Sequence, residues 1–455
     1  MCGIIGVSSP KAAEECYLGL IMMQHRGQDS CGILSFDEDI HIERGEGLAQ
    51  DYLRPRLKEL PGNIALGHVR YPTKGSDIQR EIQPFFSNFP YGVGLIHNGN
   101  IYNYPELKEE LAAQRRILFS KSDSEALLNL LCHYLTQEDI FSSIAHVMQK
   151  VRGSYSCVLA IQEENAIVGF RDPYGIRPLV LGRRGHDYCI ASESVALDVS
   201  GYELVGDIKP GEVVVVKEGK VERRVLEKRK PAHCFFEWVY FSRPDSIMEE
   251  KSVYEVRLLL GRTIQFTHEA DVVMAVPDTA RPAAQGFSER NGIVEREGMI
   301  KNRYIGRTFI MSSQHERENA VNLKLNVIKK EVCGKRIALI DDSIVRGTTS
   351  KKIVALLRKH GAREVHFVST CPPIKFPCVY GIDFPTSEEL IAYRNDDIAR
   401  SLGADSVTYQ TIEGLVSAIG ISDLCTACLT GEYPTGNDMA SFSGLRKKER
   451  QLLEV

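Results

Sequence analysis

Cys2 could act as a nucleophile without a histidine partner. If the initiator methionine is removed, this residue carries a free α-amine next to its thiol. An α-amine has a pKa of about 7.7–8.0, so it can accept the thiol proton near neutral pH. The alternative is an incidental cysteine in a first β-strand. Position alone favours that alternative, so the assignment depends on the motifs that accompany Cys2.

Five short motifs, in a fixed order along the first half of the chain, contain small and polar residues. They lie at 2–6, 24–30, 67–73, 97–101 and 122–125. Together they resemble the glutaminase domain of class II (N-terminal-nucleophile) glutamine amidotransferases, over about residues 1–230. The resemblance implies that Cys2 attacks the glutamine amide, forms a γ-glutamyl thioester and releases ammonia.

The same resemblance implies a role for four further residues. Arg70 would bind the substrate α-carboxylate with its guanidinium fork, and Asp123 would pair with the α-ammonium. The side-chain amide of Asn98 and the backbone N–H of Gly99 would form the oxyanion hole. Gly99 suits this role because Asn-Gly favours tight turns and allows close backbone approach. The motif histidines are interpreted as structural or supporting residues: His25, His68 and His97.

A second set of polar residues lies at 336–350, where an apolar strand leads into two acids, a small polar loop and a helix. Ligands of open α/β sheets bind at the carboxyl ends of strands, and a helix N-terminus with hydroxyl groups makes an anion site. Asp341 and Asp342 can accept from ribose hydroxyls or hold Mg²⁺. The other candidate ligands of this loop are Ser343, Arg346, Gly347, Thr348, Thr349 and Ser350.

This segment resembles the phosphoribosyl pyrophosphate (PRPP) loop of type I phosphoribosyltransferases, which implies that these residues bind PRPP. In that family the loop at 277–282 contacts pyrophosphate and helps to hold Mg²⁺. Thr279 is its hydroxyl residue here, whereas Arg281 departs from the family pattern. Residues 301–310 resemble the family's lid, so Lys301 and Tyr304 are expected to close over PRPP.

A glutaminase half followed by a PRPP half resembles the amidophosphoribosyltransferases over nearly the whole chain. The resemblance implies that ammonia from glutamine passes through an internal channel and attacks ribose C1. The products would be 5-phosphoribosylamine, pyrophosphate and glutamate, in the first committed step of de novo purine synthesis. It also implies inhibition by purine nucleotides and a homo-oligomer, commonly a tetramer.

Two other functions remain open from the sequence. The first is a different class II amidotransferase, such as one that aminates a sugar phosphate, and the two acids of the PRPP-like loop argue against it. The second is a non-enzymatic PRPP-binding regulator that carries an inactive glutaminase. The intact set of Cys2, Arg70, Asn98 and Asp123 argues against the regulator.

Four cysteines have surroundings that suggest a metal centre. Cys425 and Cys428 form a CxxC pair, which alone fits a redox motif, zinc or chance. With Cys234 and Cys378 they resemble the ligands of a structural [4Fe–4S] cluster, remote from both reactions, in the iron–sulfur subclass of the family. Zinc is the alternative, because it also accepts four thiolates. That subclass carries a propeptide, so we expect either removal of the initiator methionine alone or a sequence that starts at the mature end.

The remaining cysteines lie in apolar or mixed stretches without ligand spacing. We expect them to pack in the core as thiols, since disulfides are rare in cytosolic proteins. They are Cys16, Cys31, Cys132, Cys157, Cys189, Cys333 and Cys371.

The first half must position the glutaminase residues with short β-branched strands and two helices. The predicted strands lie at 64–69, 93–97, 156–161 and 211–216, and the predicted helices at 11–24 and 124–134. These patterns predict stacked antiparallel sheets with helices alongside, an α+β arrangement. The family resemblance specifies this as an N-terminal-nucleophile αββα sandwich.

The second half has the pattern of an α/β domain. A charged run at 217–233 predicts a solvated hairpin and a boundary, with the glutaminase domain at 1–230 and the phosphoribosyltransferase domain with its iron–sulfur site at 231–455. Strands at 271–277, 336–341 and 364–369 alternate with helical segments such as 350–361, which predicts a mostly parallel sheet. A solvated helix is expected in the basic tail at 445–451.

Composition limits the class of protein. The chain has 455 residues, of which 25% are charged and 43% hydrophobic, and its formal net charge is −4. This balance is that of a globular protein of two to four domains without overall attraction to nucleic acid or anionic membrane. No apolar run approaches about 18 residues, and the N-terminus lacks signal-peptide features. We therefore expect a cytoplasmic enzyme with neither nucleic-acid nor membrane partners.

Overall fold

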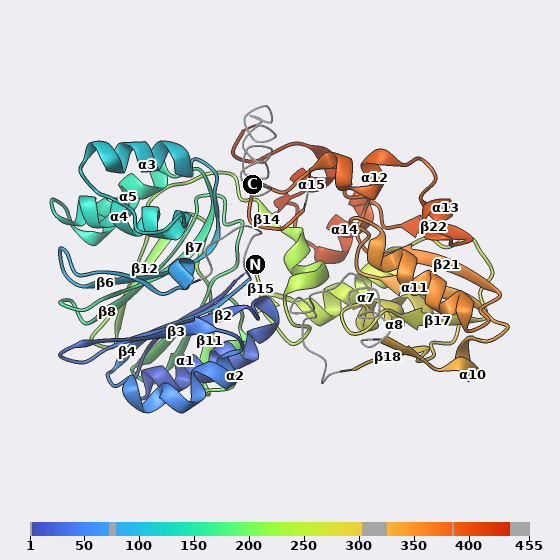
Figure 1. The fold of residues 1–455 in the computed structure, drawn as a ribbon, viewed down its shortest axis with the longest axis horizontal. Coiled ribbons are helices and arrows are strands. Elements are labelled where there is room, and N and C mark those ends of the chain that lie inside the picture. The colour runs from blue at the N-terminus through green and yellow to red at the C-terminus, as the bar shows by residue number, and fades with distance from the viewer. Residues whose placement is uncertain (1, 72–78, 303–324, 385, 437–455) are drawn as a thin grey trace.

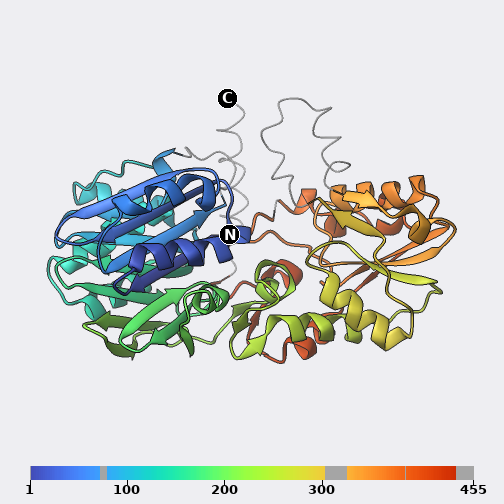
Figure 2. The same ribbon diagram turned by 90° about the horizontal axis from the view of Figure 1, so that it is seen from below.

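The chain forms two lobes, seen side by side in Figure 1 and, turned by 90°, in Figure 2. The computed structural model describes residues 2–71, 79–302, 325–384 and 386–436. Tyr304, the rest of the predicted lid at 303–310 and the basic tail at 445–451 lie outside these residues.

The first lobe contains an antiparallel sheet that begins with the N-terminal strand. Over the described residues it has seven strands in the order β11-β9-β10-β1-β4-β2-β3. They are β1 Gly3–Ser8, β2 Ser30–Phe36, β3 Ile40–Glu46, β4 Ile64–Arg70, β9 Val180–Arg184, β10 Asp187–Ala191 and β11 Glu203–Asp207. The N-terminal strand β1 lies between β10 and β4, so both of its edges are paired.

A second antiparallel sheet packs on the first. Within the same described ranges its order is β13-β12-β8-β7-β6-β5. The strands are β5 Phe85–Ser87, β6 Val93–Ile101, β7 Gly153–Ile161, β8 Ala166–Arg171, β12 Glu212–Lys217 and β13 Lys220–Val225. All four strands predicted in this half are present, but the predicted Asn98-Gly99 turn is wrong. The pairing of β6 with β7 continues from Val93 through Ile101, so both residues lie inside a strand.

Alternating side chains of the two sheets build the core of this lobe. One face of each sheet meets the other sheet, where Ile4, Leu34, Leu66 and Ile96 are buried together. The outer faces are covered by helices, α1 over β1 and β4 and α4 over β6. The helices of this lobe are α1 Ala12–Met22, η1 Gln24–Arg26, α2 Ala49–Tyr52, η2 Arg54–Glu59, η3 Gln79–Glu81, α3 Tyr104–Ala113, α4 Asp123–Leu135, α5 Ile140–Lys150 and α6 Val195–Asp198. The αββα sandwich expected from the sequence is thereby confirmed.

The second lobe is built on a parallel sheet. Its order among the described residues is β17-β20-β21-β22, with all three pairings parallel. The strands are β17 Val272–Ala275, β20 Arg336–Asp341, β21 Glu364–Ser369 and β22 Ser406–Tyr409. The α/β prediction is confirmed, and the carboxyl ends of these strands meet at one edge of the sheet, where ligands of such sheets bind.

Helices and small strand pairs surround this sheet. The helices are η4 Glu237–Phe241, α7 Val253–Thr263, α8 Arg281–Asn291, α10 Lys329–Val332, α11 Thr348–Lys359, η6 Ser387–Glu389, α12 Ile391–Arg394, α13 Ile398–Leu402, α14 Ile412–Ile419 and α15 Ala427–Thr430. The paired strands are β14 His233–Cys234 with β23 Leu424–Cys425, β15 Ile247–Met248 with β16 Lys251–Ser252, and β18 Met299–Lys301 with β19 Leu325–Val327. Hydroxyl side chains begin two of the longer helices, since Ser252 accepts from the Glu255 N–H and Thr411 from the Gly414 N–H.

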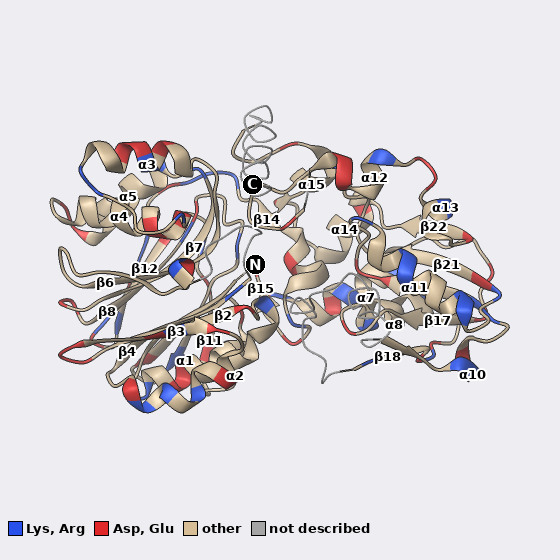
Figure 3. Ribbon diagram, in the orientation of Figure 1, with Lys and Arg blue, Asp and Glu red and all other residues tan. Residues whose placement is uncertain are grey.

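The charged run between the lobes forms the predicted hairpin. Lys217 of β12 is paired with Lys220 of β13, and β13 is mostly exposed. The chain then crosses to the second lobe, where β14 joins β23. Basic and acidic residues are interspersed on the helices of both lobes (Figure 3). In the part of the chain that the structure describes, no helix has the length and apolar character needed to cross a membrane.

Candidate active sites and cysteine centre

Cys2 lies where the two sheets of the first lobe approach each other. It is half-buried and precedes β1, and its backbone nitrogen donates to Oδ1 of Asn98 at 3.2 Å. Asn98 belongs to β6 of the other sheet and is almost fully buried. Removal of Met1 would make this nitrogen the α-amine, so the contact places the predicted nucleophile beside the strand that carries Asn98.

Both predicted oxyanion donors, Asn98 Nδ2 and the Gly99 N–H, belong to β6. Along this strand the His97 N–H donates to Gln83 Oε1 at 2.7 Å. The Ile101 N–H donates to Asp123 Oδ2 at 2.9 Å. Alternate amides of a strand point to the same side, so the Gly99 N–H points there too. Nδ2 of Asn98 is buried and has no hydrogen-bond partner within the described residues.

Close packing explains why position 99 is glycine. A Cβ at Gly99 would lie 1.9 Å from the Ser154 carbonyl oxygen of the neighbouring strand β7. No side chain fits in that space. Of the two reasons that the sequence suggested for this glycine, close backbone approach is therefore correct and the turn is not.

Two charged residues flank the β6 strand. Arg70, the last residue of β4, is almost fully buried, and its Nη2 donates to Glu81 Oε2 at 2.5 Å. Its Nη1 is buried without a hydrogen-bond partner among residues 2–71, 79–302, 325–384 and 386–436. Asp123 is the first residue of α4, whose N-cap is Ser122. The sequence predicted binding roles for Arg70 and Asp123 but none for Glu81, which the structure places against Arg70.

Two of the three motif histidines make polar side-chain contacts, and the third is buried without one among the described residues. Nε2 of His25 lies 2.8 Å from Glu193 Oε1, and Nδ1 of His97 lies 2.9 Å from Ser124 Oγ. His68 is fully buried, and its burial together with the charge of Arg70 lowers its pKa to about 3. His68 is therefore neutral at physiological pH. These contacts support the interpretation of the histidines as structural or supporting residues.

Buried ion pairs connect the two lobes behind the glutaminase motifs. Arg26 donates to Glu193 of the first lobe and, through Nη2, to Glu237 Oε2 of the second at 2.7 Å. Nη1 of Arg177 lies 3.4 Å from the other oxygen of Glu237, and Ser242 Oγ donates to Glu237 Oε2 at 3.1 Å. All these side chains are at most 2% exposed. The sequence gave no signal for this network beyond the presence of Arg26 in the 24–30 motif.

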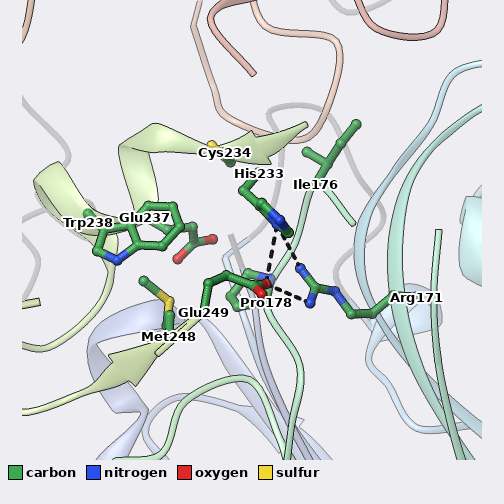
Figure 4. A pocket seen from close by; sticks show the side chains of 9 residues that line it. All are labelled: Arg171, Ile176, Pro178, His233, Cys234, Glu237, Trp238, Met248 and Glu249. Atoms are coloured by element: carbon green, nitrogen blue, oxygen red, sulfur yellow. Dashed lines mark hydrogen bonds and ion pairs between the residues drawn. The ribbon is translucent and has the colours of Figure 1, made fainter. Parts of the chain in front are cut away.

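A nearby cavity belongs to the same junction. Its volume of about 10 Å³ has room for a single water. Around it, Arg171 Nη1 lies 2.8 Å from Glu249 Oε1, and His233 Nδ1 lies 3.2 Å from the same oxygen (Figure 4). Arg171 ends β8 of the first lobe, whereas His233 and Glu249 lie in the second. The cavity is thus a structural feature of the lobe interface and contains no predicted catalytic residue.

The segment that follows Cys378 lies against the glutaminase strands. The Val379 carbonyl accepts from Asn100 Nδ2, and the Tyr380 carbonyl accepts from Ser154 Oγ, each at 2.9 Å. Gly381 has φ of 95°, and a Cβ there would lie 3.0 Å from the Gly99 carbonyl oxygen. The residues that follow Cys378 therefore lie against the strands that carry Gly99 and Ser154, whereas the predicted remoteness of the cysteine centre from both reactions stays a prediction.

In the second lobe, two loops bring hydroxyl groups to the paired acids. Asp341 ends β20, and both Asp341 and Asp342 are largely buried. Thr279 Oγ1 donates to Asp342 Oδ2 at 2.6 Å, and Ser343 Oγ donates to Asp342 Oδ1 at 2.7 Å. Burial raises the pKa of both acids, and the neighbouring Asp342 carboxylate raises that of Asp341 further. Such a buried acid pair favours a cation.

The rest of the predicted PRPP loop surrounds a helix N-terminus. Gly347 has φ of 76° and precedes α11, whose first turn contains Thr348, Thr349 and Ser350. Arg346 pairs with Glu389 at 3.1 Å instead of contacting the two acids. Lys301 likewise pairs with Asp278 at 3.2 Å. The unexpected Arg281 starts α8 and pairs with Glu297 at 2.7 Å.

Four buried cysteines meet in the second lobe beside the lobe interface. Cys234 of β14 and Cys425 of β23 are direct partners in a parallel register. Cys428 lies one turn further, in α15, and Cys378 Sγ accepts from the Tyr380 N–H at 3.3 Å. All four cysteines are only 6–7% exposed.

The four thiols influence one another electrostatically. Burial raises the pKa of Cys428, and the nearby thiols of Cys378, Cys371 and Cys425 raise it further. Even so, no three His, Cys, Asp or Glu side chains of the described residues are grouped as ligands of one ion. Of the cysteines assigned to the core, six are buried, but Cys333 is exposed, because it follows the short surface helix α10.

The fold and the sites together define a two-part glutamine amidotransferase, with an N-terminal-nucleophile sandwich joined to a phosphoribosyltransferase-like α/β lobe. Comparison with known proteins agrees. The family model described as "Glutamine amidotransferase domain" matches residues 68–199. An amidophosphoribosyltransferase of Methanothermobacter thermautotrophicus is 46% identical, over 99% of this chain and 98% of its own length. One of Pseudomonas aeruginosa is 44% identical, over 96% and 93% of the two chains.

Solved structures give the same result. Glutamine PRPP amidotransferase from B. subtilis, complexed with ADP and GMP, has a TM-score of 0.89 at 38% identity, covering 96% of this chain and 98% of that one. A structure described as the allosteric regulatory enzyme of purine biosynthesis has a TM-score of 0.90 at 38% identity, with 97% of each chain covered. The chain belongs to the amidophosphoribosyltransferase family. It is a glutamine-dependent transferase of purine biosynthesis, which decides against the sugar-phosphate and regulator alternatives.

Proposed function

We propose that Cys2, Arg70, Asn98, Gly99 and Asp123 form the glutaminase site of this enzyme. The contact between the Cys2 nitrogen and Asn98 Oδ1 carries this proposal, because it joins the N-terminus to the strand that would supply the oxyanion hole. The buried Nη1 of Arg70 suits the α-carboxylate of glutamine, and the carboxylate of Asp123 suits its α-ammonium.

The chemistry follows from these positions. After removal of Met1, the α-amine of Cys2 takes the thiol proton, and Sγ attacks the amide carbon. Asn98 Nδ2 and the Gly99 N–H stabilise the oxyanion. The resulting ammonium returns its proton to the leaving nitrogen, which departs as ammonia when the thioester forms. Water then hydrolyses the thioester to glutamate and regenerates the thiol.

The second reaction would take place at the carboxyl edge of the parallel sheet. Asp341, Asp342 and Thr279 suit Mg²⁺, which is held by one or two carboxylates together with substrate oxygens and water. The cation would neutralise the pyrophosphate leaving group. Residues of the loop and the first turn of α11 would bind the 5-phosphate through backbone amides and hydroxyls. They are Ser343, Arg346, Gly347, Thr348, Thr349 and Ser350, with Lys301 and Tyr304 as the lid residues that approach PRPP.

Ammonia must reach ribose C1 without loss. We propose that it moves inside the protein, since ammonia released to water at neutral pH becomes ammonium and loses its nucleophilic lone pair. The contacts of Asn100 and Ser154 with the 379–380 carbonyls support this route, because they close the lobe interface beside the glutaminase residues. Attack at C1 then displaces pyrophosphate and gives 5-phosphoribosylamine.

For the cysteine centre we propose a [4Fe–4S] cluster on Cys234, Cys378, Cys425 and Cys428. The burial and mutual influence of the thiols support a shared group. Zinc also accepts four thiolates, but the surroundings of these cysteines resemble those of the iron–sulfur subclass, so we propose the cluster. When bound, it would supply a structural cross-link, and iron, sulfide and zinc analysis would test the choice.

Regulation and assembly are carried over from the family. The B. subtilis relative is complexed with ADP and GMP, so we propose that purine nucleotides inhibit this enzyme as well. We also propose that the enzyme is a homo-oligomer, which in this family is commonly a tetramer. We further propose that it is cytoplasmic and that the boundary between its two domains lies near residue 230. Gel filtration with light scattering, with and without GMP and ADP, would test the assembly.

The central experiment measures glutamate and pyrophosphate together. Protein purified without oxygen is supplied with glutamine and Mg²⁺, with and without PRPP. We expect glutamate and pyrophosphate to be released in equal amounts, and only when PRPP is present. Glutamate release that does not depend on PRPP would contradict the coupled reaction. In the Cys2→Ala variant, glutamine use should vanish while ammonia-dependent pyrophosphate release persists. Cys31→Ala, which removes a buried thiol elsewhere in the same sheet, is the matched control.

A further inference from the structure

The segment 81–83 makes hydrogen bonds to β4, β6 and α4, the three elements that carry Arg70, Asn98 and Asp123. Glu81 accepts from Arg70 at the end of β4. Two residues later, Gln83 Oε1 accepts from the His97 N–H of β6, and its Nε2 donates to Ser124 Oγ of α4 at 3.1 Å. His97 precedes Asn98, and Ser124 follows Asp123. The segment therefore fixes the spacing between the three proposed binding groups.

The contact between Glu81 and Arg70 determines where the guanidinium points. The Arg70 side chain is 10% exposed and that of Glu81 6%, so water contributes little to the position of either. Glu81 binds Nη2, and Nη1 is left buried without a hydrogen-bond partner in the described part of the chain. An arginine held along one edge in this way presents its other edge to a second carboxylate.

Glu81 also lies in the same surroundings as Asp123. The hydroxyl of Tyr104 is buried, and burial raises its pKa, as do the nearby carboxylates of Glu125, Asp123 and Glu81.

We infer that Glu81 is a positioning residue that orients Arg70 toward the α-carboxylate of glutamine, and that it thereby selects α-amino acid amides over amides that lack the carboxylate. The inference rests on the proposed role of Arg70 in the glutaminase site. It adds a residue that does not contact the reacting atoms but sets which amide is accepted.

The test compares glutamine with 4-aminobutanamide, which is glutamine without its α-carboxylate. Release of ammonia from each amide is measured with PRPP and Mg²⁺ present, for the wild type, Glu81→Gln, Glu81→Asp and Arg70→Ala. The matched control is Glu212→Gln. Glu212 is a buried carboxylate that binds Arg223 at 2.8 and 2.9 Å, on the β12 strand of the same lobe.

Glu81→Gln keeps the size of the side chain and removes its charge. We expect its kcat/KM for glutamine to fall about 10- to 100-fold, mostly through KM, as for loss of a hydrogen bond to a charged group. Its kcat/KM for 4-aminobutanamide should stay within about threefold, and so should ammonia-dependent synthesis. Glu81→Asp, which keeps the charge, should retain most of the discrimination. Glu212→Gln should leave the ratio of the two amides unchanged.

Two results would overturn the inference. An equal loss for both amides in Glu81→Gln would mean a purely structural role, and an unchanged KM for glutamine would mean no role. Arg70→Ala distinguishes failure of the role inferred for Glu81 from failure of the role proposed for Arg70. If it lowers use of both amides equally, the proposed role of Arg70 fails as well. If it abolishes the discrimination while both Glu81 variants retain it, only the role of Glu81 fails.

Discussion

Replacing Glu237 with glutamine should weaken the junction between the two lobes more than any surface substitution. The carboxylate accepts from Arg26 Nη2 at 2.7 Å and from Ser242 Oγ at 3.1 Å, and it faces Arg177 Nη1 at 3.4 Å. Both arginine side chains are fully buried. Glutamine has nearly the same shape, so the substitution creates no cavity. It removes the negative charge and places an NH₂ donor among the donors of two arginines.

The structure sets the size of the effect. Breaking a buried ion pair by removing one partner costs about 3–5 kcal/mol. Arg26 retains Glu193, and Arg177 retains the Tyr380 carbonyl, so the lower end of about 3 kcal/mol applies. For a cooperative unit the size of one lobe, about 2–4 °C in Tm corresponds to each kcal/mol. We therefore expect the Tm to fall by about 6–12 °C.

Trp238 makes this junction directly observable. It is the single tryptophan of the chain, is 2% exposed, and follows Glu237 in the sequence. Its fluorescence during heating therefore reports the unfolding of this region. The control is Glu222→Gln, which removes an ion pair with Arg224 whose side chains are both 53% exposed. Exposed pairs are worth little, so a shift below about 3 °C is expected there. If Glu237→Gln shifted the midpoint no further than the control, buried charges would not hold the lobes together.

Three further substitutions test separate parts of the molecule. Gly99→Ala would place a Cβ 1.9 Å from a backbone oxygen, so glutamine-dependent synthesis should fall about 100-fold or more while ammonia-dependent synthesis stays near wild type. Asp342→Asn should lower pyrophosphate release with either nitrogen source about 100-fold and raise the Mg²⁺ requirement; loss with glutamine alone would contradict the site. Burial alone would raise the pKa of Glu193, but Arg26 and His25 outweigh it and hold the pKa below its ordinary value of about 4.5. The ionised Glu193 therefore contributes fully to the free energy of unfolding above about pH 4.5, and this contribution is lost as the pH falls. The difference in urea midpoint between the wild type and Glu193→Gln should accordingly become smaller in acid.

The residues expected to touch substrate could be predicted because their chemical types are distinctive. Two adjacent acids after an apolar strand, followed by a small polar loop, indicate a binding edge of an α/β sheet before any fold is known. The structure then brings Thr279, 63 residues away, to Asp342, although the arginine that follows Thr279 departs from the usual pattern. The prediction of a turn at Asn98-Gly99 was wrong. The local propensity of this dipeptide favours a turn, but the hydrogen-bonded pairing of β6 with β7 keeps both residues in a strand.

The residues that orient the binding groups could not be predicted in the same way. Glu81 resembles any surface glutamate in the sequence, and its importance arises only from the burial of its pair with Arg70. Arg26 and Glu237 are 211 residues apart, and only the docking of two lobes brings them together. The prediction for Cys333 was wrong because free cysteines are usually buried, and this tendency was followed although Gly334 and Lys335 next to it signal a surface turn. Composition and spacing identify chemical groups but not their long-range neighbours.

The position of Cys378 connects the cysteine centre to the glutaminase. Any group that binds its thiol fixes the three residues that follow, and two of these give carbonyls to Asn100 and Ser154. The third, Gly381, approaches the Gly99 carbonyl so closely that a side chain would crowd it. A change at the centre would therefore move the backbone that borders the proposed oxyanion strand. A group bound at Cys378 would therefore do more than stabilise the second lobe, because it would hold the backbone that the first lobe contacts.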